Sequence, residues 1–416
     1  MKRLGTLIAI LLMAVTASFS EDTYSAEVTK VSDHIYQIHL DLGGMEVNAV
    51  ASVGKDGLLL VDTGSIHCID TFKEALATFS DGDPKIIINS HAHTDHTGGN
   101  GSFGSAPVII AHEIVRERVR TGSYLLLEYP DEALPDITFK DSMTVYFNGE
   151  EIKIISIPGS HDDNDAIVYF TGSNVVYAGD LFYSMMFPTL DGTYGDPLKY
   201  AEANRKLIEL LPDDAVVIPG HGRLSNMEDL RAFHEMLDHT TEIVKKEYAQ
   251  GQDLATIQAG KIIDKYDSFN YDLYKTTDGW IQDLHDALKG EKPLPSLTEP
   301  LYWEIKKSGA KGAIKFYEEL RKDHFEEYAF GPGVIYSIAT NYFMIQERWD
   351  DAIIFHEYGL EEYSDWQFTW AFYEGLAETH VQLGNNQQAI DNYKHSLELF
   401  PDNAAAKAMI KELEAK

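Results

Sequence analysis

The sequence predicts an α/β domain followed by an all-α region, and three observations support this division. From residue 35 to about residue 219, short β-branched runs alternate with turns and helical patterns. After His221 helical periodicity dominates, and strand patterns almost vanish. Beyond residue 300 a helical pattern recurs three times. A chain of 416 residues is long enough to hold two or three such domains.

The first half of the chain contains eight apolar, β-branched runs that are typical of strands. They are residues 35–40, 48–53, 58–61, 85–89, 108–111, 152–157, 166–170 and 175–178. Helical patterns lie between some of them, at residues 69–79 and 113–120. In the second half, residues 227–249 and 254–265 have the spacing of amphipathic helices.

These patterns divide the chain into four segments. We expect a signal peptide at residues 1–20, an α/β domain at 21–225, a helical extension with a linker at 226–300, and a repeat module at 301–416. The linker is predicted because three prolines fall within residues 291–300.

The charge of the chain excludes one class of partner. It carries 34 Lys and Arg against 67 Asp and Glu, a formal net charge of −33. Such a chain repels phosphate backbones, and no basic stripe offsets this repulsion. We therefore expect no nucleic acid among its ligands.

The N-terminus resembles a secretory signal. Met1, Lys2 and Arg3 precede an uncharged run at residues 4–15, and small residues follow it. The run is too short to span a bilayer comfortably, so we expect no stable membrane anchor after cleavage. The single cysteine, Cys68, cannot form an internal disulfide and is expected in the core. The sequence thus predicts a periplasmic or secreted protein.

The segment His91-Ala92-His93-Thr94-Asp95-His96 carries four side chains that can bind metal within six residues. It directly follows the predicted strand at residues 85–89, so the four side chains can converge on two adjacent ions. Imidazole and carboxylate together suit Zn²⁺, and iron or manganese would also be accepted.

Three further candidate ligands follow apolar, β-rich runs. They are His161, Asp180 and His221. Because each stands at the end of a predicted element, one edge of a sheet could gather them beside the first motif.

Together with Asp62 in Val61-Asp62-Thr63-Gly64, these motifs resemble the metallo-β-lactamase superfamily, in which HxHxDH is followed by distant His, Asp and His. The resemblance covers roughly residues 36–222. It implies an αββα sandwich with a two-metal site at one edge. It also implies that Asp62 orients a ligand by hydrogen bonds.

The resemblance implies seven ligands for two zinc ions per chain: His91, His93 and His161 for the first, Asp95, His96 and His221 for the second, and Asp180 bridging both. A water between the ions would lose its proton and attack an ester, lactone, thioester or amide carbonyl of a small-molecule substrate. Asp95 could relay a proton while it remains a ligand.

The pattern departs from that of many classical β-lactamases, which carry cysteine where this chain has Asp180. An aspartate there is closer to glyoxalase II, lactonases and arylsulfatase-like members. Tyr183 follows Asp180 by three residues, as a tyrosine does in lactonases, where it donates to the substrate carbonyl. The other interpretation of Tyr183 is a ring packed beneath the site. Hydrolysis of β-lactams stays open as an alternative activity.

The C-terminal region repeats itself. Residues 312–317 resemble residues 351–356 and residues 388–393, and the shared alanines are 39 and 37 residues apart. This period is slightly longer than the 34 residues of a tetratricopeptide unit. Such repeats bind a peptide or another copy of the chain. The alternative of another class is therefore an interaction protein with a degenerate hydrolase scaffold, against which the seven intact ligands argue.

Overall fold

The computed structural model describes residues 24–42, 45–104, 107–121, 129–190, 194–271, 274–290, 294–295, 297–366, 368–401 and 403–415. The chain divides into two compact units. The sandwich unit comprises Thr23–Arg120 and Tyr129–Pro293, and the C-terminal helical unit contains Leu294–Lys416. The predicted signal peptide at residues 1–20 lies outside the described residues, as does part of the predicted linker at 291–300.

The first sheet of the sandwich unit has seven strands in chain order. They are β1 (Tyr24–Lys30), β2 (Ile35–Leu42), β3 (Glu46–Gly54), β4 (Gly57–Val61), β5 (Ile86–Ile88), β6 (Val108–His112) and β7 (Ile137–Phe139). Strands β1 to β4 pair antiparallel, whereas β4 to β7 pair parallel. The parallel part places the ends of β4, β5 and β6 along one edge.

The second sheet has six strands in the order β13-β12-β11-β10-β9-β8. Their bounds are β8 (Ser142–Phe147), β9 (Glu150–Ser156), β10 (Ala166–Phe170), β11 (Val175–Tyr183), β12 (Val216–His221) and β13 (Ser225–Asn226). Only the β11–β12 pair is parallel. The two strands therefore end at the same edge of this sheet.

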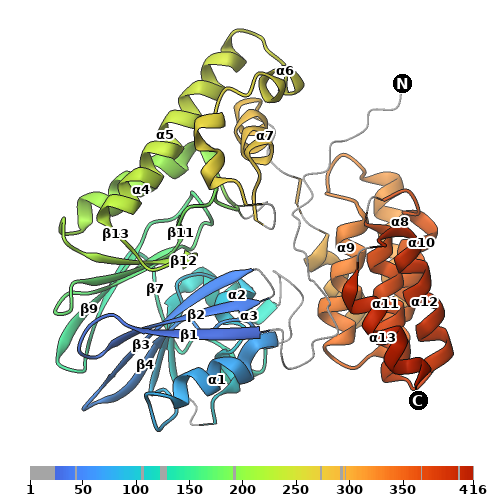
Figure 1. Cartoon of the computed structure of the whole chain (residues 1–416), viewed down its shortest axis with the longest axis horizontal. Helices are drawn as coiled ribbons and strands as arrows, with labels where there is room; N and C mark the ends of the chain where they lie inside the picture. The colour runs from blue at the N-terminus through green and yellow to red at the C-terminus, as the bar shows by residue number, and fades with distance from the viewer. Residues whose placement is uncertain are drawn as a thin grey trace. The chain divides into compact units, whose positions relative to one another are not determined.

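The two sheets face each other across an apolar layer. Val50, Val61 and Ile88 of the first sheet lie in one buried cluster with Val168 and Ile218 of the second. Inward side chains that alternate along the strands produce this layer, because only one face of each strand can be buried there. The arrangement of the sheets is visible in Figure 1.

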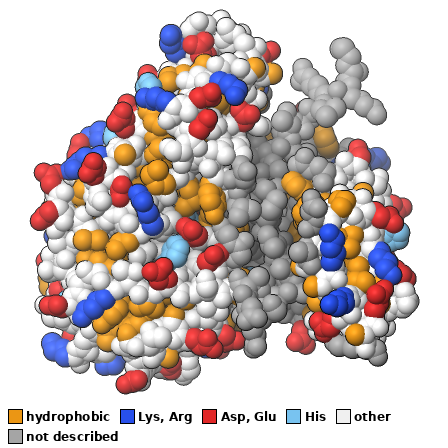
Figure 2. Space-filling model, viewed as in Figure 1, with side chains coloured by type: hydrophobic (Ala, Val, Ile, Leu, Met, Phe, Trp, Pro, Cys, Tyr) orange, Lys and Arg blue, Asp and Glu red, His pale blue; other side chains and the backbone are white. Residues whose placement is uncertain are grey.

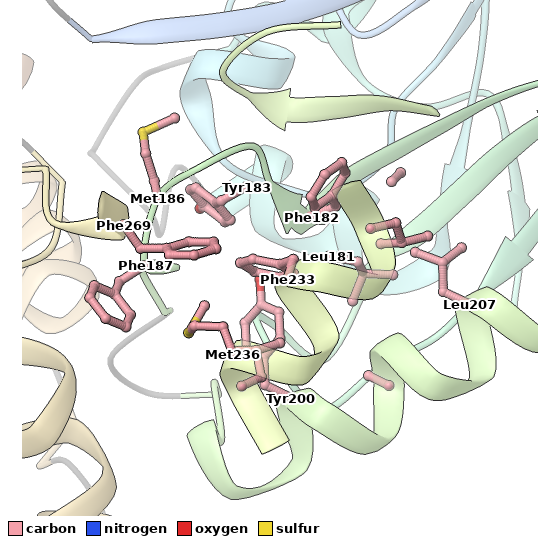
Figure 3. Packing of buried hydrophobic residues seen from close by; sticks show 14 of the residues in the cluster. Leu181, Phe182, Tyr183, Met186, Phe187, Tyr200, Leu207, Phe233, Met236 and Phe269 are labelled. Atoms are coloured by element: carbon pink, nitrogen blue, oxygen red, sulfur yellow. The ribbon is translucent and has the colours of Figure 1, made fainter. Parts of the chain in front are cut away.

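Helices cover the outer faces of both sheets. Helix α1 (Ile69–Ala77) packs on the first sheet through Phe72. Helices α4 (Pro197–Leu210), α5 (Met227–Ala249) and α7 (Thr277–Leu288) share a buried cluster with the second. Figure 3 shows Phe182 of β11 packed among side chains of α4 and α5. The predicted αββα sandwich is confirmed.

Shorter helices complete the sandwich unit. They are η1 (Ile66–Cys68), α2 (Thr94–Thr97), η2 (Asn100–Ser102), α3 (Glu113–Thr121), η3 (Asp131–Ala133), α6 (Leu254–Ala259) and η4 (Asp264–Phe269). The helix expected at residues 254–265 is thus interrupted, because Gly260 caps α6 and Lys261 has a positive φ of 51°. Helices α5 to α7, expected as an extension, lie in the same compact unit as the sheets.

The C-terminal helical unit contains only helices among its described residues. They are α8 (Thr298–Asp323), α9 (Pro332–Ser337), the π-helical η5 (Ile338–Met344), α10 (Trp349–Glu362), α11 (Thr369–Gln382), α12 (Asn386–Leu399) and α13 (Ala404–Glu414). The repeated alanines Ala313, Ala352 and Ala389 are fully buried in α8, α10 and α12. The tetratricopeptide character of these helices stays a prediction.

Two surface properties bear on the environment of the chain. Figure 2 shows acidic side chains over both units on the face that it presents. In the described part of the chain, no helix combines the length and the apolar character that a membrane crossing needs.

Candidate metal centre

The seven proposed ligands come from strands, a short helix and loops that meet along one edge of the sandwich unit. His91 and His93 follow β5, and Asp95 and His96 lie in α2. The other three come from the second sheet: His161 from the β9–β10 loop, Asp180 from β11 and His221 from the end of β12. They form two groups, each with its ligand atoms within 4.8 Å of one another: His91, His93, His161 and Asp180; and Asp95, His96 and His221.

The carboxylate of Asp180 joins the two groups. Its Oδ2 atom lies 3.4 Å from His161 Nε2 and 3.8 Å from His91 Nε2, both of the first group. The same atom lies 3.1 Å from His221 Nε2, and Oδ1 lies 3.2 Å from His96 Nε2. Asp180 therefore stands where a ligand shared by two ions would stand.

Two glycines allow Asp180 to reach this position. Gly179 has a φ of +52°, and the β11–β12 register shifts on both sides of it, so the strand bulges and turns the next side chain. A Cβ atom on Gly220 of β12 would lie 2.0 Å from Asp180 Oδ1. Only glycine at residue 220 leaves room for the carboxylate. The strand expected to end at Ala178 thus continues through the bulge to Tyr183.

The imidazoles of His91 and His96 are oriented by one network. Ser90 donates through its backbone N and its Oγ to Asp62, at 2.8 and 2.6 Å. Since the Ser90 hydroxyl proton is used there, Ser90 Oγ accepts from His91 Nδ1 at 2.9 Å. His96 Nδ1 donates to Asp62 Oδ2 at 2.8 Å. Both rings therefore carry their proton on Nδ1 and keep the lone pair of Nε2.

His161 and His221 are held in the same tautomer by other partners. His161 Nδ1 donates to Asp165 Oδ1 at 2.9 Å. His221 Nδ1 donates a hydrogen bond to the backbone carbonyl of Glu46. In their neutral form, these four imidazoles from three segments of the chain thus direct an unprotonated Nε2 toward the Asp180 carboxylate.

The donor set fits divalent metal ions. Among the described residues, His91 Nε2 and His161 Nε2 are buried and have no hydrogen-bond partner. A buried polar atom without a partner is costly unless something else coordinates it. Imidazole with carboxylate is a donor set that Zn²⁺ and related ions accept.

His93 faces a different kind of partner. Its Nε2 atom lies 3.5 Å from Asp162 Oδ2. Asp162 is fully buried and receives two bonds of 2.6 Å from Arg118. Arg118 also pairs with Asp163 at 2.7 Å and stacks on the ring of Tyr194. The charge beside His93 is therefore fixed by a buried arginine.

Electrostatics keep both buried carboxylates ionised. Burial raises the pKa of Asp180, but the positive charge that the four imidazoles carry when protonated, His221 first, outweighs burial and holds this pKa well below its usual range. For Asp162, burial likewise raises the pKa, while His93 and then Arg118 lower it further than burial raises it. Each carboxylate is thus available as an anion at neutral pH.

Tyr183 is fully buried beside the centre. Its hydroxyl donates to Asp180 Oδ2 at 2.6 Å and lies 2.8 Å from Thr189 Oγ1. Its ring stacks on that of His221, with centroids 4.9 Å apart. Figure 3 shows it beside Met186. In this arrangement the hydroxyl holds the carboxylate of Asp180.

Asp62 and Cys68 occupy the places expected for them. Asp62 has a φ of +60°, a strained position for a non-glycine residue, and accepts from Ser90, His96 and Tyr177. Cys68 is buried in the cluster beneath α1, and burial raises the pKa of its thiol to about 12. A thiol in this state is no nucleophile.

Several residues around the centre were missed by sequence reasoning. Asp162 and Asp165 lie in the acidic run after His161, which was a local signal for them. Ser90 stands directly before the HxHxDH motif. Arg118 and Tyr274 carry no such signal, because only the fold brings their segments to the site.

Comparison with known proteins agrees with this geometry. Residues 42–221 match the family described as "Metallo-beta-lactamase superfamily". The matched range contains all seven proposed ligands. This part of the chain is therefore similar to the metallo-beta-lactamase superfamily, and its His and Asp cluster is suited to divalent metal.

Three similar proteins illustrate the range of relatives. "Metallo-beta-lactamase domain-containing protein 1" of Rattus norvegicus is 27% identical over 172 residues, 40% of this chain and 62% of that protein. "Metallo-beta-lactamase type 2" of Bacteroides fragilis is 20% identical over 53% of this chain and 85% of its own length. "Hydroxyacylglutathione hydrolase" of Prochlorococcus marinus is 28% identical over 33% of this chain and 50% of its own.

The alignments with the Rattus norvegicus and Prochlorococcus marinus proteins cover only part of this chain and only part of each relative. The chain spans about three fifths of the length of the Metallo-beta-lactamase domain-containing protein 1 of Rattus norvegicus, Mus musculus and Homo sapiens. The family match ends at His221, before helices α5 to α7 and the C-terminal helical unit.

Proposed function

Because residues 42–221 are similar to the metallo-beta-lactamase superfamily, we propose that the protein is a hydrolase with two divalent cations, chiefly zinc, at the Asp180 centre. The observation that carries the proposal is the position of the Asp180 carboxylate, within 3.1 to 3.8 Å of four histidine Nε2 atoms from both ligand groups. A scaffold without a catalytic role has no need to converge so many buried polar atoms.

The cations, held by the seven ligands, would supply Lewis acidity for a substrate carbonyl and would lower the pKa of water so that hydroxide is available at neutral pH. The residues of the chain supply the geometry. Asp62, Asp165 and the Glu46 carbonyl fix the tautomers of the histidines. Asp95 is the most exposed ligand, with 35% of its side chain accessible, and its Oδ2 lies 3.5 Å from both His96 and His221. It is therefore the group placed to take a proton from the reacting water and return it to the leaving group.

The proposed substrate class is a small molecule with an ester, lactone, thioester or amide carbonyl. Two relatives are named for β-lactam and hydroxyacylglutathione hydrolysis, respectively. Asp180, where classical β-lactamases carry cysteine, favours the ester, lactone and thioester bonds over the lactam. Hydrolysis of β-lactams is the second candidate within the same mechanism.

The N-terminal pattern of Lys2, Arg3 and an uncharged run supports export, so we propose that the enzyme acts in the periplasm or outside the cell. The C-terminal helical unit is proposed to bind a peptide or a second copy of the chain. The competing proposal is that the protein is an interaction protein, which binds its partner through the C-terminal helical unit and has a degenerate hydrolase scaffold without activity. Activity that depends on metal separates the two.

The test combines metal analysis with a panel of chromogenic substrates. We expect purified protein to contain close to two metals per chain and to lose hydrolysis of at least one ester, lactone, thioester or lactam after chelation. Zinc should restore the activity. His161→Ala should bind less metal, and His395→Ala, at an exposed position, should match the wild type. Full activity after exhaustive chelation would contradict the mechanism, and no metal with no turnover would favour the interaction protein.

A further inference from the structure

One side chain reaches the metal centre from outside the matched domain. Residue Tyr274 lies between η4 and α7, more than fifty residues beyond the end of the family match at His221. We propose that Tyr274 is a positioning residue that orients His221, and that the helices after the matched domain thereby complete the second metal position. The inference rests on the proposed function only in assuming that the centre binds metal.

The hydroxyl of Tyr274 makes two contacts at the back of the His221 ring. It lies 2.9 Å from His221 Nδ1, and it donates to the backbone carbonyl of Glu46. His221 Nδ1 faces the same carbonyl. The Tyr274 hydroxyl and His221 Nδ1 therefore both donate to the Glu46 carbonyl, and each restricts the position of the other. As a result, His221 Nε2 stays directed at Asp180 Oδ2, 3.1 Å away.

The rings restrict the plane of His221 as well. The Tyr274 ring lies edge-on to His221, with centroids 5.0 Å apart and an angle of 61°. Tyr183 stacks on the same imidazole at 4.9 Å and 15°. The two tyrosine rings are themselves in contact, 6.2 Å apart. Three mutually packed rings leave His221 little freedom to rotate about its χ2 torsion.

The segment that carries Tyr274 is held at both ends. Tyr274 N donates to the Tyr271 carbonyl at 2.9 Å, and Tyr271 pairs with Lys275 in an isolated bridge. Lys275 forms an ion pair of 2.7 Å with Asp283 of α7. The Thr276 hydroxyl caps α7 by accepting from Gly279 N. Helix α7 thus determines where the phenol lies, which is what a positioning residue requires.

The same region offers a matched control. The hydroxyl of Tyr266 lies 3.0 Å from His239 Nδ1, so Tyr266→Phe also removes one contact between a phenol and an imidazole. Neither residue is a proposed ligand. A general effect of losing a phenol hydroxyl in these helices would therefore alter both variants.

The experiment measures metal binding by full-length protein and needs no substrate. The two dissociation constants for Zn²⁺ are obtained by competition with a chromophoric chelator, and the ligand field by the absorption spectrum of the Co²⁺-loaded protein. We expect Tyr274→Phe to weaken the looser Zn²⁺ by about 10- to 100-fold and to change the Co²⁺ spectrum. The tighter Zn²⁺ should bind as in the wild type. Tyr266→Phe should leave both constants and the spectrum unchanged.

The outcomes separate this inference from the proposed function. If the wild type binds two ions and Tyr274→Phe binds both as tightly with the same spectrum, the positioning role is refuted and the hydrolase proposal stands. If both tyrosine variants weaken binding alike, the effect belongs to helix packing and the inference also fails. If the wild type binds no metal, the centre itself is wrong and both proposals fall.

Discussion

Buried histidines occur in both compact units, and their surroundings differ in an instructive way. In the sandwich unit, His91 and His161 are fully buried, with one ring nitrogen bonded and Nε2 without a hydrogen-bond partner among the described residues. In the C-terminal helical unit, His356 is equally buried, and both of its ring nitrogens lack such a partner there.

The neighbours of these rings explain the difference. Around His91 and His161 the Asp180 carboxylate and other imidazoles converge, and Ser90 and Asp165 accept hydrogen bonds from the two Nδ1 atoms. Around His356 the structure places Tyr336 and Phe372, each about 6.0 Å away between ring centroids. The ring also lies so close to α11 that a Cβ on Gly375 would be 2.2 Å from it.

A buried histidine nitrogen without a hydrogen-bond partner therefore indicates a different role in each of the two units. In the sandwich unit, the Nε2 atoms of several histidines point toward the Asp180 carboxylate, and together they form a candidate metal centre. In the helical unit, a single ring among aromatic side chains is a packing element that costs stability. The two roles are distinguished by Nδ1, which is hydrogen-bonded to a protein group in His91 and His161 but not, among the described residues, in His356.

The largest expected effect is at the carboxylate that both ligand groups share. Asp180→Asn keeps the shape of the side chain but removes its charge, so it should release one metal and lower kcat by about 10³-fold or more, a loss of about 4 kcal/mol in transition-state stabilisation. Metal content and steady-state rates measure this. Asp213→Asn, at a surface ion pair with Arg231, is the control. An Asp180→Asn enzyme with two metals and normal turnover would show that Asp180 is not shared.

The next effect concerns the buried charge beside His93. Asp162→Asn removes the buried anion that pairs with Arg118, so we expect a loss of about 3 kcal/mol in the free energy of unfolding. Zn²⁺ affinity should fall about tenfold, because His93 loses its orienting partner. Urea denaturation and chelator competition measure the two effects. Replacing both Arg118 and Asp162 by uncharged residues should restore part of the stability but not the affinity. A single variant as stable as the wild type would contradict this account.

The smallest effect is at His356, whose ring nitrogens have no hydrogen-bond partner in the described part of the chain. Burial lowers the pKa of His356 to about 3, against an ordinary value near 6.5. As the pH falls from about 6.5 toward 3, His356 binds a proton in the unfolded chain but not in the folded chain. The free energy of unfolding therefore decreases over this range. Between pH 7 and pH 5 this contribution amounts to about 2 kcal/mol, and His356→Leu should abolish it.

Tryptophan fluorescence during denaturation measures that change, since four of the five tryptophans lie after residue 300. His395→Leu, at an exposed position, should keep the pH dependence of the wild type. Equal pH dependence in His356→Leu and the wild type would show that His356 can be protonated in the folded chain.

The sequence predicted the sandwich because each strand carries its own local signal. Runs such as Ala166–Phe170 and residues 58–61 are strongly β-branched or apolar, and the structure contains them within a residue or so. Strand β1 (Tyr24–Lys30) was missed because its polar residues weaken the pattern, and its pairing with β2 stabilises it. The C-terminal end of β11 was missed because the bulge at Gly179 has no periodicity of its own.

By itself, the sequence determined the two regions of the chain and all seven candidate ligands, because HxHxDH, His161, Asp180 and His221 each follow an apolar strand in a recognisable order. Only the tertiary structure decided how these ligands are held. The ion pair of Arg118 with Asp162 joins residues 44 apart, and the contact of Tyr274 with His221 joins residues 53 apart. Such contacts depend on how helices α3 and α7 pack near the sheets, and no local pattern encodes the direction in which a side chain points once its segment is packed.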